Sequence, residues 1–105
     1  MISQGDCLMD LKQIQKRIFE NKLTKGFNID NVEKEFCFLM GEVSEAFDAY
    51  NKKQETLGSE LADIAIYLLG LSEMLGINLS EEIQKKILVN ENREYIKVNG
   101  ANVKK

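Results

Sequence analysis

The sequence has 105 residues and a mass of 12.0 kDa, which is the size of a single domain. Hydrophobic residues make up 44% and charged residues 30%, a balance typical of soluble globular proteins. Histidine is absent, which excludes catalysis by a histidine base and zinc sites with histidine ligands. The net charge of −3 and the pI near 5.0 argue against nucleic-acid binding. Any active site is therefore expected to use carboxylates, which prefer hard metal ions.

The first residues contain no basic segment followed by an apolar one, so no secretory signal is predicted. The longest apolar run, residues 64–71, is far shorter than the ~20 residues that cross a bilayer. We therefore expect a cytoplasmic protein that does not bind a membrane. In that reducing compartment, Cys7 and Cys37 are expected to be free thiols.

Apolar residues recur with helical spacing, and proline is absent, so helices are expected throughout. A first helix is predicted from residue 6 to about 23, with a loop and Gly26 after it. Asp30, with Glu33 three residues later, predicts the N-cap of a second helix that ends near Asn51. The apolar stripe of the first helix is formed by Cys7, Leu11, Ile14 and Ile18.

A third helix is predicted over residues 57–75 and is closed by Gly76. Asn78, with Glu81, predicts the cap of a fourth helix to about residue 98, followed by a frayed tail, 99–105. The sequence therefore predicts one all-α domain, residues 1–105, that resembles a four-helix bundle.

The second and third helices carry long apolar stripes that are expected to form the core. Each helix also has apolar residues on other sides, which predicts subunit contacts, most simply an isologous dimer or a dimer of dimers. The second-helix stripe is Val32, Phe36, Leu39, Met40, Val43, Phe47 and Tyr50, and the third-helix stripe is Leu57, Leu61, Ile64, Leu68, Leu71 and Leu75.

Two acidic pairs lie away from these stripes, Glu42 with Glu45 and Glu60 with Asp63. Residues three apart share one side of a helix, and the connection between the pairs is long enough for a turn between antiparallel helices. Either pair alone is most simply a solvated face. Together the pairs predict four carboxylates that face one another and repel. A divalent cation removes that repulsion, and Mg²⁺ suits an all-oxygen site, with Mn²⁺ as a substitute.

At this point the sequence resembles the all-α nucleoside triphosphate pyrophosphatases of MazG type, whose signature is E-x-x-E followed by E-x-x-D. The signature stands here as Glu42-Val-Ser-Glu45 and Glu60-Leu-Ala-Asp63, and the likeness extends over roughly residues 28 to 95. The resemblance implies Mg²⁺-dependent hydrolysis of a (d)NTP to a (d)NMP and pyrophosphate, with these four carboxylates as metal ligands. It also implies that Glu42 or Glu45 takes a proton from the water that attacks the α-phosphorus.

Basic and amide side chains are the candidates for binding the triphosphate. Lys86, Asn90 and Arg93 share one face of the fourth helix and resemble a K-x-x-x-N-x-x-R element of the family. Lys53 follows the second helix. Phe27 and Phe38 are candidates for stacking on the base, and each is as readily a core or subunit contact.

Alternatives to a (d)NTP pyrophosphohydrolase remain open. Members of the same superfamily that act on phosphoribosyl-ATP, or that resemble dimeric dUTPases, would share the metal chemistry. A helical oligomerisation module without catalytic activity is the alternative from another class. The resemblance further implies a homodimer or homotetramer, with sites shared between chains.

Overall fold

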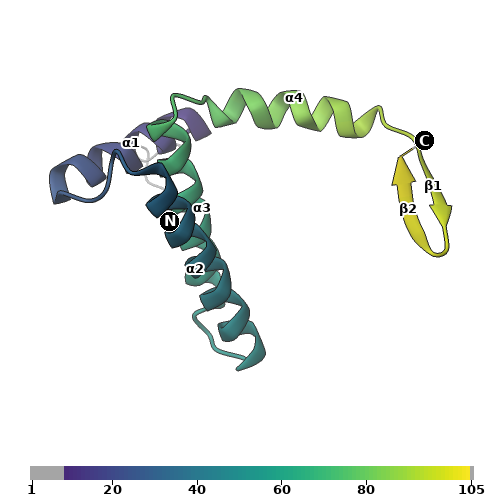
Figure 1. Cartoon of the computed structure of the whole chain (residues 1–105), viewed down its shortest axis with the longest axis horizontal. Helices are drawn as coiled ribbons and strands as arrows, with labels where there is room; N and C mark the ends of the chain where they lie inside the picture. The colour runs from purple at the N-terminus through teal and green to yellow at the C-terminus, as the bar shows by residue number, and fades with distance from the viewer. Residues whose placement is uncertain (1–8, 105) are drawn as a thin grey trace.

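In the computed structural model, which describes residues 9–104, the chain forms four helices followed by a β-hairpin (Figure 1). The predicted all-α, bundle-like class with four helices is confirmed, and the hairpin is an addition that the sequence analysis missed. None of the described helices is long and apolar enough to cross a membrane. The elements are α1 (Leu11–Lys25), α2 (Val32–Asn51), α3 (Leu57–Met74), α4 (Leu79–Glu91), β1 (Tyr95–Val98) and β2 (Ala101–Lys104).

Local hydrogen bonds explain where the first two helices begin and end. The Asp10 side chain accepts from the Gln13 N–H, and the Gln13 side chain accepts from the Asp10 N–H, which forms a capping box for α1. Gly26, with φ 71°, ends the helix. The predicted N-cap of α2 at Asp30 is wrong. The cap is Asn31, whose side chain accepts from the Lys34 N–H at 3.0 Å.

The predicted fourth helix to residue 98 and the frayed tail are both wrong. Helix α4 ends at Glu91, and β1 pairs antiparallel with β2, with Ile96 opposite Val103. The reason lies in Asn99 and Gly100, whose φ angles of 52° and 82° are those of a type I′ turn. Such a turn joins two adjacent strands, so the residues directly before it, Tyr95–Val98, are extended as β1 instead of helical.

The four helices and the hairpin do not pack into one compact body. Helices α2 and α3 lie antiparallel side by side, α1 packs across α3, and α4 runs away from this group with the hairpin at its far end (Figure 1). The Cα radius of gyration is 17.0 Å. A compact chain of this length has a radius of gyration of about 13 Å. The chain is therefore much less compact than a typical single domain.

The apolar stripes predicted as the core are largely exposed in the single chain. Phe47 is 65% exposed and Leu61 is 53% exposed, whereas Leu71 is buried. Because α4 runs away, nothing in residues 9–104 covers that side of α2 and α3 (Figure 1). The buried apolar residues of the described chain are Ala46, Ala49, Leu69 and Leu71.

Buried polar side chains hold α1 in place. Gln15 donates to the Glu73 carboxylate at 2.9 Å and to the Ile77 carbonyl at 2.7 Å, and so it ties α1 to the end of α3. Lys22 forms an ion pair with Glu35 at 2.6 Å, and both side chains are buried. Asn28 donates to the second oxygen of Glu35 at 3.0 Å.

Candidate metal site and adjoining pocket

Three carboxylates meet between α2 and α3. Glu42 comes from α2, and Glu60 and Asp63 come from one side of α3. Each offers an oxygen that lies within 4.8 Å of those of the other two, and all three residues are half-buried. Spacing of three residues on α3 and antiparallel pairing with α2 bring them together.

Glu45 stands beside this trio. It lies on the next turn of α2, is exposed, and is within hydrogen-bonding reach of the Glu42 carboxyl group. The structure therefore gathers three of the four predicted ligands and leaves the fourth at the edge of the group.

Burial and crowding change the acidity of two side chains. The pKa of Glu42 is raised from its ordinary value by burial first, and then by Glu45, Asp63 and Glu60. The pKa of Tyr67 is raised by burial and by the neighbouring carboxylates, with Glu42 contributing most among them. Without a cation, negative charge at this position is therefore unfavourable.

The donor set fits a hard divalent cation. All its ligand atoms are carboxylate oxygens, which is the set that Mg²⁺ and Mn²⁺ prefer. Burial is the main cause of the raised pKa of Glu42, and two positive charges where the three carboxylates converge would offset the repulsion that adds to it. Glu42, Glu60 and Asp63 are placed to hold such an ion, and Glu45 is placed to assist.

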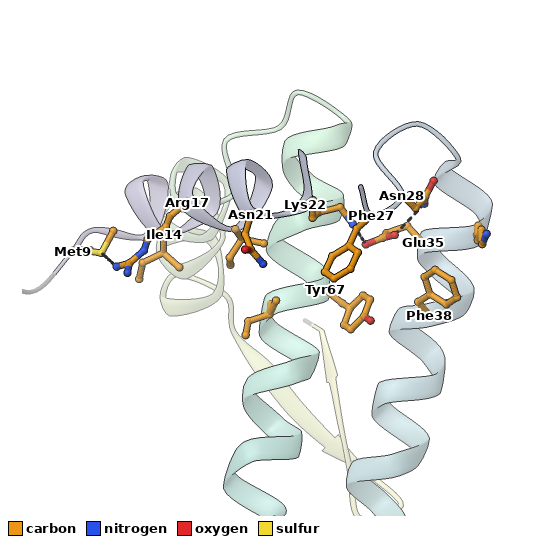
Figure 2. Close-up of a pocket in the computed structure, with 13 residues that line it drawn as sticks. Met9, Ile14, Arg17, Asn21, Lys22, Phe27, Asn28, Glu35, Phe38 and Tyr67 are labelled. Atoms are coloured by element: carbon orange, nitrogen blue, oxygen red, sulfur yellow. Dashed lines mark hydrogen bonds and ion pairs between the residues drawn. The ribbon is translucent and has the colours of Figure 1, made fainter. Parts of the chain in front are cut away.

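A pocket of about 610 Å³ is formed by residues of α1, α2, α3 and the α1–α2 loop (Figure 2). The rings of Phe27, Phe38 and Tyr67 gather in its wall between the α1–α2 loop, α2 and α3 (Figure 2). Phe38 and Tyr67 meet edge to face, with centroids 6.2 Å apart. Tyr67 is one turn from Asp63, and Phe38 is one turn from Glu42, so the pocket and the carboxylates are neighbours.

Polar groups complete the pocket wall. The Asn21 amide lies on α1, the buried Lys22–Glu35 pair lies beneath the loop, and Lys34 places its ammonium 5.7 Å from the centroid of the Phe38 ring (Figure 2). Phe27 and Phe38 were predicted from the sequence as candidates for stacking, whereas no role was predicted for Tyr67 or Asn21. The spacing of Tyr67 from Asp63 was the available signal for Tyr67.

None of the predicted triphosphate ligands is among the residues that line the pocket. Lys53 is exposed in the turn after α2. Lys86 and Asn90 are exposed on α4, and Arg93 follows it, with its guanidinium 3.5 Å from the Asn90 side-chain oxygen. Helix α4 points away from the α2–α3 pair (Figure 1). Within one chain, the α4 residues are not brought to the carboxylates.

These features define a helical protein with an all-carboxylate site beside an aromatic pocket. The model of the MazG-like family matches residues 25–105, which is most of the chain, and the chain belongs to that family. The family is part of a superfamily of nucleoside triphosphate pyrophosphohydrolases and is typically metal-dependent. No curated protein and no solved structure matches the chain.

Proposed function

We propose that this protein is a Mg²⁺-dependent pyrophosphohydrolase that converts a (d)NTP to a (d)NMP and pyrophosphate, with Mn²⁺ as a possible substitute. The observation that carries the proposal is the convergence of Glu42, Glu60 and Asp63 within 4.8 Å, next to an aromatic pocket. Membership in the MazG-like family supports the reaction type.

The four carboxylates have two roles in this proposal. Glu42, Glu45, Glu60 and Asp63 hold the cation, which when bound neutralises phosphate charge and makes a water molecule more acidic. Glu45 or Glu42 accepts the proton of the water that attacks the α-phosphorus in line. Exposure and a position outside the tight trio favour Glu45 as this base.

The pocket is the proposed site for the nucleoside. Phe27, Phe38 and Tyr67 offer ring surfaces for stacking on a base. The Asn21 amide offers both a donor and an acceptor to the base edge. With the base in this pocket, the triphosphate would extend along the α2–α3 seam toward the carboxylates.

Lys53, Lys86, Asn90 and Arg93 remain the proposed triphosphate ligands. Because α4 points away from the carboxylates of its own chain, its residues would serve the site of a second copy (Figure 1). The exposed apolar faces of α2 and α3 also support a homodimer or homotetramer. The other proposed partner is the nucleotide itself.

Pyrophosphate release, measured over a panel of nucleotides with Mg²⁺, tests the proposal. Asp63→Asn should lower the rate by about 100-fold or more, because it removes one anionic ligand from the trio. Asp48→Asn is the matched control, since that exposed residue on α2 only pairs with Lys52, and it should keep the wild-type rate.

The panel includes phosphoribosyl-ATP and dUTP, so that a preference for either identifies the related activities. Near-normal turnover by Asp63→Asn would refute the ligand assignment. A folded wild-type protein that hydrolyses no nucleotide and shows no thermal shift with Mg²⁺ or Mn²⁺ would instead be a non-catalytic module.

A further inference from the structure

Phe27, in the loop between α1 and α2, brings its ring to the pocket although the residue is 56% exposed. The ring lies near those of Phe38 and Tyr67 in the pocket wall (Figure 2). A side chain that is more than half exposed has few packing contacts to hold it in one place. The position of the Phe27 ring therefore depends on how firmly the loop backbone is held.

Hydrogen bonds on both sides of Phe27 hold that backbone. The Phe27 N–H donates to the Lys22 carbonyl of α1 at 2.9 Å. The Asn28 side-chain amide donates to the Asn31 carbonyl at 2.8 Å and to the Glu35 carboxylate at 3.0 Å. Its oxygen accepts from the Asn31 N–H at 3.1 Å. The Asn28 side chain therefore closes the loop on itself and ties it to α2.

Glu35 is in turn held from α1. It is 1% exposed, and its second oxygen lies 2.6 Å from the Lys22 ammonium. Lys22, Asn28 and Glu35, here called the loop anchor, all line the pocket (Figure 2). Because each oxygen of the Glu35 carboxylate has its own donor, one buried group fixes the spacing of α1, the loop and α2.

We infer that the loop anchor positions Phe27 for stacking on the base of the nucleotide. This inference rests on the pyrophosphohydrolase activity proposed above and names residues that set the affinity of that site for its substrate. A ring that is already held at the pocket wall loses less conformational freedom when a base binds, so the affinity is higher. The three anchor residues act through Phe27 and are positioning residues.

The anchor is expected to affect KM rather than kcat. Glu35 precedes Glu42 by two turns of α2, which is about 10 Å along the helix axis. The carboxylates that would hold the cation come from Glu42 onward on α2 and from the start of α3. Loosening the loop therefore weakens binding of the nucleoside and leaves the chemical step at the α-phosphorus intact.

Asn28→Ala tests the anchor, because it cuts the link from the loop to Glu35 and keeps the Lys22–Glu35 ion pair. With the four dNTPs and Mg²⁺, KM should rise at least about fivefold, and kcat should change less than about twofold. Asp30→Ala is the matched control. It truncates an exposed residue of the same loop that is not among those lining the pocket, and both constants should stay at wild-type values.

A double-mutant cycle asks whether Asn28 acts through Phe27. Phe27→Ala alone should raise KM at least as much as Asn28→Ala does. Adding Asn28→Ala to Phe27→Ala should then raise KM no further. Additive increases in KM, an unchanged KM in Asn28→Ala, or a loss confined to kcat would each overturn the inference. Circular dichroism checks that the variants keep the wild-type helix content.

Hydrogen exchange at the loop amides is a readout that needs no reaction. In the free protein, the Phe27 amide should exchange faster in Asn28→Ala than in wild type, and Asp30→Ala should match wild type. Unchanged exchange of the Phe27 amide in Asn28→Ala, with wild-type turnover present, would reject the anchor and leave the proposed function standing. A wild-type protein that hydrolyses none of the dNTPs would refute the proposed function and this inference with it.

Discussion

Three other carboxylates surround Glu42. Its side chain is half-buried and faces Glu60 and Asp63 across the α2–α3 seam, with Glu45 one turn further along α2. Burial and these three neighbours raise its pKa. A group with a raised pKa in the folded state stabilises the fold most when it is protonated.

That shift gives a pH-dependent prediction for Glu42→Gln. The stabilising effect of protonated Glu42 is fully present below its ordinary pKa of 4.5 and is lost as the pH rises through the raised value. In chelator, Glu42→Gln should therefore unfold at a higher temperature than wild type near pH 7, and this difference should vanish below about pH 4.

Thermal unfolding over a pH series measures this difference. Glu55→Gln, in the exposed turn before α3, is the control and should match wild type. Added Mg²⁺ should raise the unfolding temperature of wild type more than that of Glu42→Gln. Equal unfolding temperatures of Glu42→Gln and wild type at pH 7 in chelator would contradict the crowding of Glu42.

At this scale, sequence spacing anticipated that Glu42, Glu60 and Asp63 come together, but it did not indicate which side chains surround them. Spacing within a helix fixes which side of that helix Glu60 and Asp63 occupy. The pairing of Lys22 with Glu35 joins two helices, and no local pattern in the sequence indicates which distant charge a lysine will meet. Tyr67 and Asn21 reach the pocket through the same kind of packing between elements.

The two buried residues of helix α1, Gln15 and Lys22, are both polar. Gln15 holds it at the end of α3, and Lys22 holds it to α2 through Glu35. Gly70 on α3 allows the close approach, since a Cβ there would lie 3.3 Å from the Lys22 side chain. Helix α1 and its following loop in turn form one wall of the pocket (Figure 2).

Lys22→Met tests this attachment. The substitution leaves the Glu35 carboxylate buried without its cation, so the free energy of unfolding should fall by about 3–5 kcal/mol. Lys52→Met, which breaks the exposed pair with Asp48, should cost less than about 1 kcal/mol. Urea unfolding at one fixed protein concentration compares the two, and similar costs would contradict a structural role for the buried pair.

Elements whose signals are local were predicted best. The middles of the four helices follow apolar periodicity, and Gly26 ends α1 as expected. The C-terminal region was misassigned because Tyr95, Ile96 and Val98 fit either a helix or a short strand, and the turn signal of Asn99 and Gly100 was overlooked. Apart from Asn99 and Gly100, this region contains no local signal, such as a proline, that would end the fourth helix early.

The whole molecule is open and extended rather than compact. Its dimensions are 50 × 35 × 35 Å, and its apolar stripes on α2 and α3 lie open. Sequence periodicity predicted these stripes as the core, and in the single chain most of their residues are exposed instead. Predicted core residues such as Phe47 lie exposed in the single chain, and in the homo-oligomer proposed above a second copy would cover them.

The direction of α4 has a genetic consequence for the proposed enzyme. Asp63→Asn disrupts the carboxylate site but keeps the basic groups. The double variant Lys86→Ala with Arg93→Ala removes the basic groups but keeps the carboxylates. Each variant alone should be inactive. If α4 of each subunit serves the site of its neighbour, half of the dimers in an equal mixture are mixed after subunit exchange, and each mixed dimer has one complete site. The mixture should therefore regain about a quarter of wild-type turnover. Mixing two inactive variants would then restore measurable activity. No recovery of activity would mean that the basic groups act in the same chain as the carboxylates they serve.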